Sequence, residues 1–471
     1  MQQSKIISLL RCLTPKEIRR LDDFLRSPYF DAPADVLALW GVLLPLAPRF
    51  PDAQIDRYQV VAQAFPGRPL LTDNEISKLL NALLLLAEQF LAIEDLRRTP
   101  ADAEWRVLTA YHRHGLDKNF QGSLRRAQRM LDEMPHRDEQ WLHLHYAVTS
   151  IAARAQVHNQ ARAQDQHLQR LSDALDDYYL STRLRFICER VNRQHILSSA
   201  AEAPLQEYDR HLLAASAQSQ APSVQLYARL LLLLTEGEDS RHFDALLAHI
   251  EAHQATLSRD ELRELYSYLQ NHCIRRVRLG EAHFLRALFD LYQRLIRDGA
   301  LLENGELSPW KYKNIASVGL QLGEFGWVED FITRHQPYLP ENFRDSAYAY
   351  NLADLAYHRG DYPLALRTLG QVEFSDVFYA LGTRRIQLKI YYEQDATEPM
   401  LSLIQAFRVY LRRNKLVADA TRLAYTNFLS LVQALYKAQS TGHRAHLIAQ
   451  IEGTQPLVEE AWLRKMADET T

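Results

Sequence analysis

The sequence has few of the residues that mark many familiar protein classes. Its 471 residues include only 3 cysteines, 16 glycines and 18 prolines. The cysteines lie far apart, at Cys12, Cys188 and Cys273, and none belongs to a Cys-x-x-Cys pair. An odd and sparse set of cysteines argues against a disulfide framework and favours a reducing compartment. Scarce glycine argues against a turn-rich β fold and favours helices joined by short connections.

Neither charge nor hydrophobicity is concentrated in the chain. Charged residues make up 24% and the net charge is only −3, so no global field attracts nucleic acid or an anionic membrane. The longest apolar runs, residues 82–87 and 230–234, are far shorter than the ~18 residues that a membrane-spanning helix needs. The first residues contain no apolar run long enough for a secretory signal peptide. We therefore predict a cytoplasmic location.

The chain also lacks the short motifs that carry most catalytic chemistry. It has no glycine-rich phosphate loop, no Gly-x-Ser-x-Gly elbow and no paired cysteines. Cys273 stands beside His272 and before three arginines, which favours a reactive thiolate, but a buried and inert cysteine is the commoner case. The sequence therefore predicts a protein that is not an enzyme and carries no cofactor. An enzyme whose site follows no known motif is the alternative.

Helix-forming residues are abundant. Leucine, alanine, arginine, glutamate and glutamine dominate the composition, and these residues favour α-helices. Capping boxes that begin at Thr14, Thr72 and Ser258 mark helix starts. Apolar residues recur at helical spacing, most clearly after Thr72, and no segment alternates convincingly as a strand does. The predicted fold class is all-α.

Breaks between the expected helices divide the chain into three parts. Residues 1–98 are predicted to form an N-terminal helical bundle of four or five helices. Residues 99–300 are expected to form an array of helical hairpins, because short polar breaks separate consecutive helices. Residues 301–471 are expected to continue the array and to end in capping helices that cover its apolar end. The predicted architecture is a bundle followed by an α-solenoid of stacked antiparallel hairpins.

One stretch, residues 308–376, matches itself. Asn314 falls on Asn351, Gly323 on Gly360 and Phe325 on Tyr362, at an offset of 37 residues in each case. A constant offset in this range is typical of a repeated helical hairpin.

On these residues the stretch resembles the tetratricopeptide repeat. The family pattern has Asn-Leu-Gly in the first helix, Gly-x-Tyr/Phe at the turn and a small alanine in the second helix. The residues that carry the resemblance are Asn351, Leu352, Ala353, Gly360, Tyr362 and Ala365. The earlier copy departs at Val328, where the family has alanine, and a weak third copy has Gln394 where glycine belongs. The whole chain also resembles uncharacterised bacterial helical-repeat proteins, a resemblance that implies a fold but no activity.

The resemblance implies a concave groove lined by the first helix of each hairpin. In some tetratricopeptide proteins, an asparagine at the place of Asn314 and Asn351 hydrogen-bonds a peptide, aided by lysine or arginine. The residues of the predicted groove are Lys311, Asn314, Asn351, Arg385 and Lys389. Amides and cations on one face would hold a protein or peptide partner, and a clamp for a carboxylate is the more specific interpretation. Alternatively, the asparagines bridge neighbouring helices and the cations are solvated. The leading hypothesis is an interaction scaffold.

A basic strip follows the groove residues. It comprises Arg384, Arg408, Arg412, Arg413 and Lys415, with aromatic residues interleaved. Cations with aromatics are typical of surfaces that bind single-stranded nucleic acid by phosphate contact and stacking. A nucleic-acid-associated regulator is therefore the alternative function. The opposing interpretation places the aromatics in a hairpin core and the arginines on its solvated face.

Three histidines, His242, His249 and His253, fall on one stripe of an expected helix. Imidazoles arranged in this way are able to ligate zinc. The stripe flanks apolar positions such as Phe243 and Ile250, so histidines at the edge of a core are the ordinary explanation. We predict no metal.

Overall fold

The computed structural model of the chain describes residues 1, 3–68, 71–157, 166–197, 205–236, 240–372, 376–438 and 444–469. These residues form 23 α-helices and four short 3₁₀ helices, with no strand among them. Their only β-type pairing is an isolated bridge between Glu303 and Glu306. The predicted all-α class is confirmed.

The chain divides into two compact units. Unit 1 comprises Met1–Ile187 and Gln206–Ala228, and unit 2 comprises Cys188–Leu205 and Arg229–Thr471. The expected boundary after residue 98 falls inside unit 1, where one helix ends at Arg98 and the next begins at Pro100. The expected boundary after residue 300 falls inside unit 2. The division into three parts stays a prediction.

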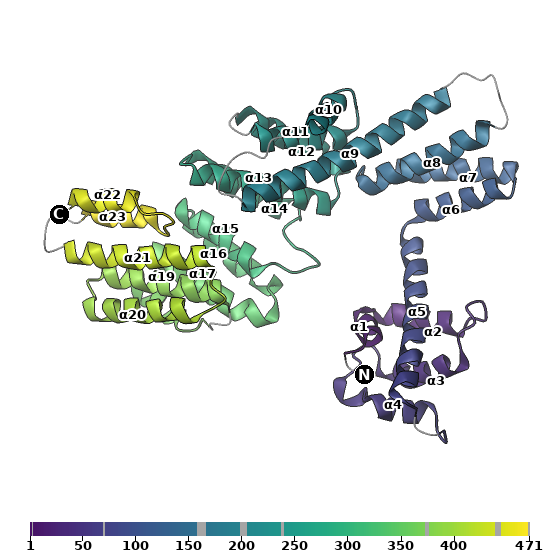
Figure 1. The fold of residues 1–471 in the computed structure, drawn as a ribbon, viewed down its shortest axis with the longest axis horizontal. Coiled ribbons are helices and arrows are strands. Elements are labelled where there is room, and N and C mark those ends of the chain that lie inside the picture. The colour runs from purple at the N-terminus through teal and green to yellow at the C-terminus, as the bar shows by residue number, and fades with distance from the viewer. Residues whose placement is uncertain are drawn as a thin grey trace. The chain divides into compact units, whose positions relative to one another are not determined.

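Five helices at the N-terminus pack around a single apolar core (Figure 1). They are α1 (Lys5–Cys12), α2 (Pro15–Arg26), α3 (Ala34–Leu43), α4 (Arg57–Ala64) and α5 (Asp73–Arg98). The predicted capping boxes form at two of the starts, since Thr14 and Thr72 each exchange hydrogen bonds with the glutamate three residues later. These reciprocal bonds satisfy backbone N–H groups that a helix start leaves without partners.

Helix α5 passes the length and composition test for a membrane-spanning helix, alone among the described helices. Its buried positions include Ile76, Leu80, Leu83, Ala87 and Phe90, all within the core of the N-terminal bundle. Core helices of soluble proteins pass the same test, because a helix packed on several sides needs a broad apolar face.

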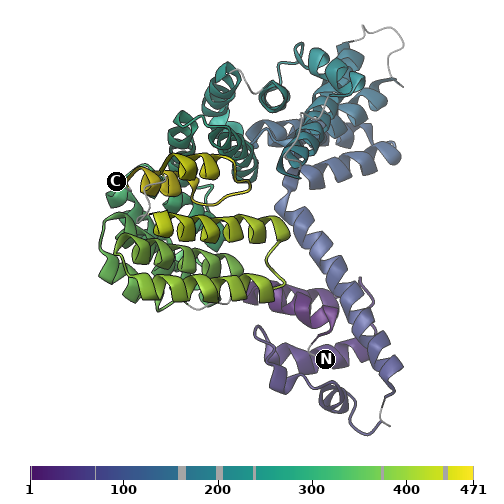
Figure 2. The same ribbon diagram turned by 60° about the vertical axis from the view of Figure 1, so that its left-hand side comes forward.

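The rest of unit 1 contains a second apolar core, which its first three helices form. Its helices are α6 (Pro100–Arg113), α7 (Asp117–Glu133), α8 (Glu139–Val157), the first part of α9 (Gln166–Leu197), α10 (Glu207–Ser216) and the start of α11 (Pro222–Thr235). Helix α6 packs against both α7 and α8, and the three lie side by side in Figures 1 and 2. Leu108, Phe120 and Leu131 are buried between them.

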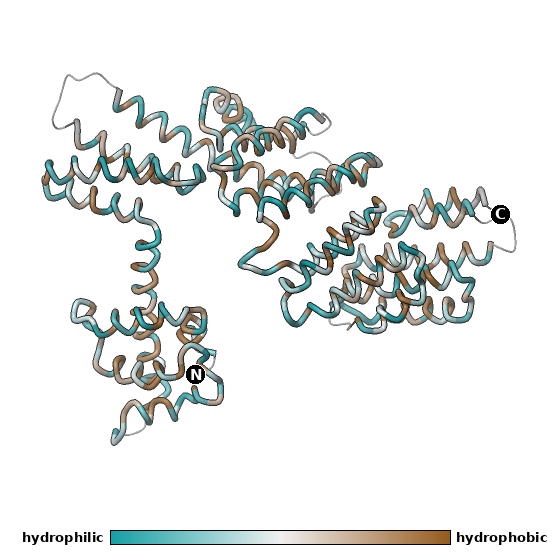
Figure 3. The backbone as a smooth tube through the Cα atoms, turned by 180° about the vertical axis from the view of Figure 1, so that it is seen from behind, coloured by the Kyte–Doolittle hydropathy of each residue, from teal (hydrophilic) through white to brown (hydrophobic). Residues whose placement is uncertain are grey.

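Unit 2 continues with helices that pack on their neighbours in chain order. They are α12 (Ser240–His253), α13 (Arg259–Arg278), α14 (His283–Arg297), α15 (Pro309–Gln321), α16 (Phe325–His335), α17 (Glu341–His358), α18 (Tyr362–Leu369), α19 (Val377–Glu393), α20 (Thr397–Arg413), α21 (Asp419–Ala438), α22 (Arg444–Glu452) and α23 (Glu460–Glu469). Helix α15 packs on α16 and α17, α17 on α18 and α19, and α20 on α19 and α21. Helices α19, α20 and α21 run side by side in Figure 2. Hydrophobic and hydrophilic positions alternate along these helices (Figure 3).

The helix ends explain the glycines of the matching stretch. Gly323 and Gly360 follow α15 and α17 with φ of 75° and 79°, a left-handed conformation that favours glycine. After α19 the residue with a left-handed backbone is Asp395, with φ of 52°, and not Gln394. Aspartate tolerates this conformation better than most residues. The third copy therefore keeps the turn with a different residue, one position later than the sequence comparison placed it.

The departure at Val328 also has a physical explanation. A Cβ atom added to Gly319 on α15 would lie 2.5 Å from the Val328 side chain on α16, closer than two carbon atoms approach. Gly319 thus makes room for the larger valine. Where the repeat pattern has a small residue on the second helix, this chain has it on the first.

Candidate functional site

The two asparagines of the predicted groove lie in different surroundings. Asn314 on α15 is exposed, whereas Asn351 on α17 is almost fully buried. The Asn351 amide donates a hydrogen bond of 2.7 Å to the Ala347 carbonyl on its own helix. The two side chains therefore do not form one matched pair of peptide-binding amides.

The two cations of α19 contact the same carboxylate, which belongs to the chain itself. Arg385 Nη1 lies 2.7 Å from Glu459 Oε1, and Lys389 Nζ lies 2.7 Å from Glu459 Oε2. Glu459 directly precedes α23 and has a left-handed backbone, with φ of 59°. The structure thus brings Arg385 and Lys389 together around an internal partner.

A second carboxylate completes this Glu459 cluster, which we define as Asp354, Arg385, Lys389 and Glu459. Asp354 on α17 is buried, 4.0 Å from Arg385 Nη2, and its other oxygen lies 3.5 Å from His358 Nδ1. Burial by itself raises the pKa of each carboxyl group. The neighbouring cations, together with His358 beside Asp354, outweigh burial and hold both pKa values below the ordinary range. Two anions therefore balance two cations inside the protein.

Aromatic residues and a third carboxylate surround the cluster. Glu393 accepts hydrogen bonds of 2.5 Å from Tyr357 Oη and from Trp462 Nε1, and a further one from Tyr362 Oη. Lys389 Nζ lies 4.6 Å from the centroid of the Tyr357 ring. These bonds connect α17, α18 and α19 to α23. The cluster and its surroundings therefore attach the terminal helix to the preceding ones.

Sequence reasoning missed the acidic members of this site. Asp354 lies on the helical face of Tyr350 and Tyr357, and Glu393 comes four residues after Lys389. A carboxylate within an otherwise apolar helical face is a signal of a buried ion pair, because an isolated buried charge is strongly unfavourable. That signal was available. No such signal in the sequence pointed to their partner Glu459, which lies 70 residues after Lys389 along the chain.

The start of α15 carries Lys311, a residue of the predicted groove. Lys311 is half-buried, and burial together with Arg263 lowers its pKa. The neighbouring Lys313 lies 5.3 Å from the ring centroid of Tyr350. Burial, assisted by Arg385, lowers the pKa of Lys313 to about 8. Both lysines are therefore poorly solvated cations.

Three large aromatic side chains near the start of α15 are exposed. We define the aromatic patch as Trp310, Tyr338 and Phe378, which are 45%, 44% and 54% exposed. Tyr379 Oη donates to the Pro309 carbonyl at 2.9 Å, so the starts of α19 and α15 adjoin. The Tyr338 carbonyl accepts a hydrogen bond from the Leu307 N–H, which places Tyr338 beside the same start.

The basic strip separates into engaged and free residues. Arg384 lies over the Tyr410 ring at 4.2 Å, and Arg408 Nη2 donates to Gln433 Oε1 at 3.1 Å. The remaining members are Arg412, Arg413 and Lys415. They are exposed around the end of α20, and no described residue pairs with them. Two residues of the strip are thus engaged within the protein, and three are open to solvent.

Of the candidate histidines on α12, His249 and His253 contact each other, whereas His242 contacts a glutamate. His242 Nε2 lies 3.4 Å from Glu236, while His253 Nδ1 lies 3.0 Å from the His249 carbonyl, with the two rings 4.2 Å apart. No group of three or more His, Cys, Asp or Glu residues suited to a metal ion occurs in the described part of the chain.

Cys273 is fully buried in α13. Burial raises the pKa of its thiol to about 12, the opposite of what an active thiolate requires.

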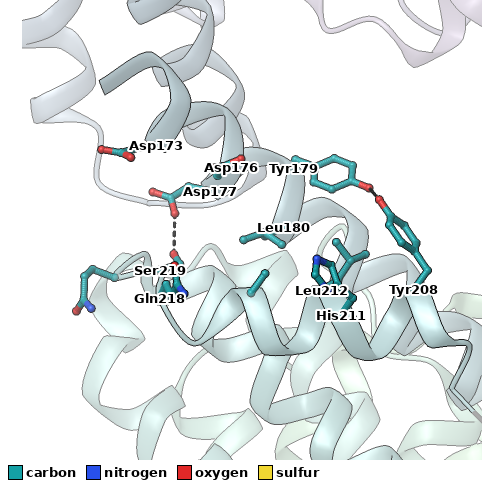
Figure 4. Close-up of a pocket in the computed structure, with 12 residues that line it drawn as sticks. Asp173, Asp176, Asp177, Tyr179, Leu180, Tyr208, His211, Leu212, Gln218 and Ser219 are labelled. Atoms are coloured by element: carbon teal, nitrogen blue, oxygen red, sulfur yellow. Dashed lines mark hydrogen bonds between the residues drawn. The ribbon is translucent and has the colours of Figure 1, made fainter. Parts of the chain in front are cut away.

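Unit 1 contains a pocket whose lining includes acidic residues (Figure 4). It has a volume of about 730 Å³ between α9 and the segment from α10 to the start of α11. Asp173, Asp176 and Asp177 line it from α9. Asp177 accepts a hydrogen bond of 2.6 Å from the Ser219 hydroxyl, and the hydroxyls of Tyr179 and Tyr208 lie 2.6 Å apart at its other side. Part of this acidic lining is therefore already engaged within the protein.

Comparison with known proteins adds no family to this description. The chain matches no protein-family model, no curated protein and no solved structure at a significant level. Function must therefore be argued from the residues themselves.

Proposed function

We propose that the protein is a cytoplasmic, non-catalytic interaction scaffold that binds a protein or peptide partner on helices α15, α17 and α19. In this proposal α15–α20 form a tetratricopeptide-like array of three stacked antiparallel hairpins, and α21–α23 cap it. The order of helix packing supports the array, as does a left-handed residue after the first helix of each hairpin.

The observation that carries the proposal is the aromatic patch beside Lys311 and Lys313. Binding hot spots are enriched in tryptophan and tyrosine, which bury a large area at a low entropic cost. Here exposed aromatic side chains lie near the start of α15, the helix that also carries two poorly solvated cations and the exposed amide of Asn314. A partner segment that carries apolar and acidic side chains matches this surface.

The Glu459 cluster supports the choice of an acidic partner segment. The predicted groove residues Arg385 and Lys389 hold the carboxylate of a connecting segment between α22 and α23. That segment is attached by a further hydrogen bond, from the Asn427 amide to the Pro456 carbonyl. Helices of the array thus already recognise an acidic residue on non-helical chain. In the proposal, Arg385, Lys389 and Asn351 serve the fold, while Lys311 and Asn314 serve the partner.

Cross-linking mass spectrometry on complexes isolated from the native cell tests the proposal. The full chain is compared with Trp310→Ala/Phe378→Ala. We expect a partner peptide cross-linked near Lys311 or Lys313, and a loss of roughly thirtyfold or more in its affinity for the variant, the range of a hot spot.

Leu416→Ala is the matched control, because Leu416 is an exposed apolar residue of the same unit outside the aromatic patch. Circular dichroism should show that all variants stay folded. Equal affinity of the partner for the Trp310→Ala/Phe378→Ala variant and the wild type would refute this binding surface.

A nucleic-acid-associated regulator is the second candidate function. The observation that favours it is the group of exposed cations Arg412, Arg413 and Lys415, for which no described residue provides a carboxylate. Phosphate groups are the natural partners of such cations. The near-neutral charge of the whole chain argues against it.

A further inference from the structure

Helix α9 carries large apolar side chains on the face that points away from the core. The helix is 32 residues long, and its part up to Ile187 belongs to unit 1. With ~100° between successive residues, the positions 7, 11 and 18 after Leu168 lie within about 20° of it around the helix axis. We define the α9 stripe as these four residues, which are 52%, 43%, 41% and 60% exposed: Leu168, Leu175, Tyr179 and Phe186.

The core side of the same helix lies opposite the stripe. Leu184 and Ile187 are buried, and they lie about 160° and 180° from Leu168 around the helix axis. The outer face of a helix in a soluble protein is usually polar. An exposed apolar surface that runs for ~27 Å along a helix is instead typical of a binding surface. Tyr208 on α10 extends it, since its hydroxyl lies 2.6 Å from that of Tyr179 (Figure 4).

The order of the stripe residues points to a second copy of the same helix. They are separated by 7, 4 and 7 positions, a spacing that reads the same from both ends. When two copies of α9 lie antiparallel about a two-fold axis, Leu168 faces Phe186 of the second copy. Leu175 likewise faces Tyr179 of the second copy. The spacing is also that of a coiled-coil seam, so every residue of the stripe meets an apolar residue.

Charged residues beside the stripe fit the same arrangement. Asp176 and Arg183 lie on one edge of it, about 80° and 60° from Leu168. Asp176 is exposed, and Arg183 is partly exposed with a contact of 4.0 Å to Asp209. Helical side chains lean toward the N-terminus of their own helix. In an antiparallel pair, Asp176 and Arg183 of the second copy therefore lean toward each other, with opposite charges.

We propose that the protein forms a homodimer through the α9 stripe, with the two α9 helices antiparallel. The occupant of this surface is a second copy of the chain. The self-complementary spacing and the complementary charges at the edge favour it over an unrelated helix, which would need neither. This interface belongs to unit 1, lies outside the aromatic patch and does not depend on the scaffold proposal.

Analytical ultracentrifugation of the full chain tests the dimer. We expect the wild type to dimerise at micromolar concentration. Leu175→Glu/Phe186→Glu should raise the dissociation constant roughly hundredfold or more, because each substitution buries an unpaired charge twice in a symmetric interface. Leu85→Glu/Leu91→Glu is the matched control, since these two leucines are exposed on α5, another helix of unit 1. It should dimerise like the wild type, and circular dichroism should show that both variants keep their helix content.

Chemical cross-linking tests the orientation of the two helices separately. All variants for this test carry Cys12→Ser, which removes the exposed native thiol. A short bismaleimide should join Leu168→Cys to Phe186→Cys in a mixture of the two variants. Leu168→Cys alone should stay unlinked, because its two copies lie ~27 Å apart along an antiparallel pair. The proposal is overturned if the wild type stays monomeric at about 0.1 mM, if the two double glutamate variants dimerise alike, or if Leu168→Cys alone is joined as efficiently as the mixture.

Discussion

The N-terminal bundle (α1–α5) and the C-terminal helices (α15–α23) reach stability in different ways. Among the described residues of the bundle, the only buried charged residue is Glu94. Its partners Arg20 and Arg97 are 42% and 65% exposed, so they keep much of their hydration. The C-terminal helices instead enclose the Glu459 cluster, with both signs of charge removed from water.

The two kinds of interior, an apolar core and a buried ion-pair cluster, fix the positions of the helices with different precision. Apolar packing is non-directional and tolerates small shifts. A buried ion pair requires a defined geometry, because leaving either charge unpaired is far more unfavourable than keeping both. We infer that the bundle is held by its apolar core, whereas the Glu459 cluster fixes the register of α23 against α17 and α19.

The largest expected effect comes from Glu459→Gln. The substitution keeps the side-chain volume but leaves Lys389, itself buried, without its anion. We expect a loss of about 3 kcal/mol in the unfolding free energy of the C-terminal helices. Hydrogen exchange by mass spectrometry measures this locally, as faster exchange in α19 and α23 with no change in α5.

Glu460→Gln is the matched control for this comparison. Glu460 is the next residue, and its ion pair with Arg464 is 37% and 43% exposed. An exposed pair contributes roughly 0 to 1 kcal/mol. Equal exchange rates in Glu459→Gln and Glu460→Gln would show that burial of the cluster does not set its importance.

Acid should weaken the C-terminal helices more than the bundle. Glu459 and Asp354 have lowered pKa values in the folded chain. Their contribution is therefore present above the unfolded pKa values of about 4, and it is lost as the pH falls through the folded values.

His358 adds a dependence of the opposite sign. Burial by itself lowers its pKa, but the hydrogen bond and charge of Asp354 raise it above the ordinary value. Its contribution is present below about 6.5 and is lost as the pH rises through the folded pKa. The protein is unfolded with urea at several pH values between 3 and 8. Brief hydrogen-exchange labelling at one fixed pH then reports the unfolding of the C-terminal helices and of the bundle separately. An identical pH dependence in both regions contradicts this prediction.

A smaller effect is expected for Glu94→Gln in the bundle. Arg20 and Arg97 lose an anion but stay in contact with water, so the unfolding free energy should fall by less than about 1 kcal/mol. The same exchange measurement, read in α2 and α5, gives the value. A loss as large as that of Glu459→Gln would remove the distinction between the two interiors.

The bundle was the easier of the two regions to predict from sequence. Capping boxes at Thr14 and Thr72 and the apolar spacing after Thr72 depend on neighbouring residues alone, and the corresponding helices form. The turn glycines Gly323 and Gly360 are local in the same sense. Local signals of this kind are independent of how distant segments meet.

The candidate site depended on contacts that no local pattern contains. The sequence led us to place Arg385 and Lys389 in one predicted groove, but the carboxylate that joins them comes from Glu459, far along the chain. Asn314 and Asn351 match in sequence yet differ in exposure, because only Asn351 is covered by neighbouring helices. Which positions stay open to a partner is decided by tertiary packing.

The smallest effect on stability is expected for Arg412→Ala/Arg413→Ala, and it decides between the two candidate functions. Both side chains are exposed, so thermal unfolding should change by less than about 0.5 kcal/mol. A scaffold predicts no salt-sensitive binding of a single-stranded oligonucleotide by the wild type or this variant. Arg125→Ala/Arg129→Ala, a pair of exposed arginines on α7, controls for unspecific charge. Binding that weakens steeply with salt and is lost only in Arg412→Ala/Arg413→Ala would establish the basic strip as a nucleic-acid surface.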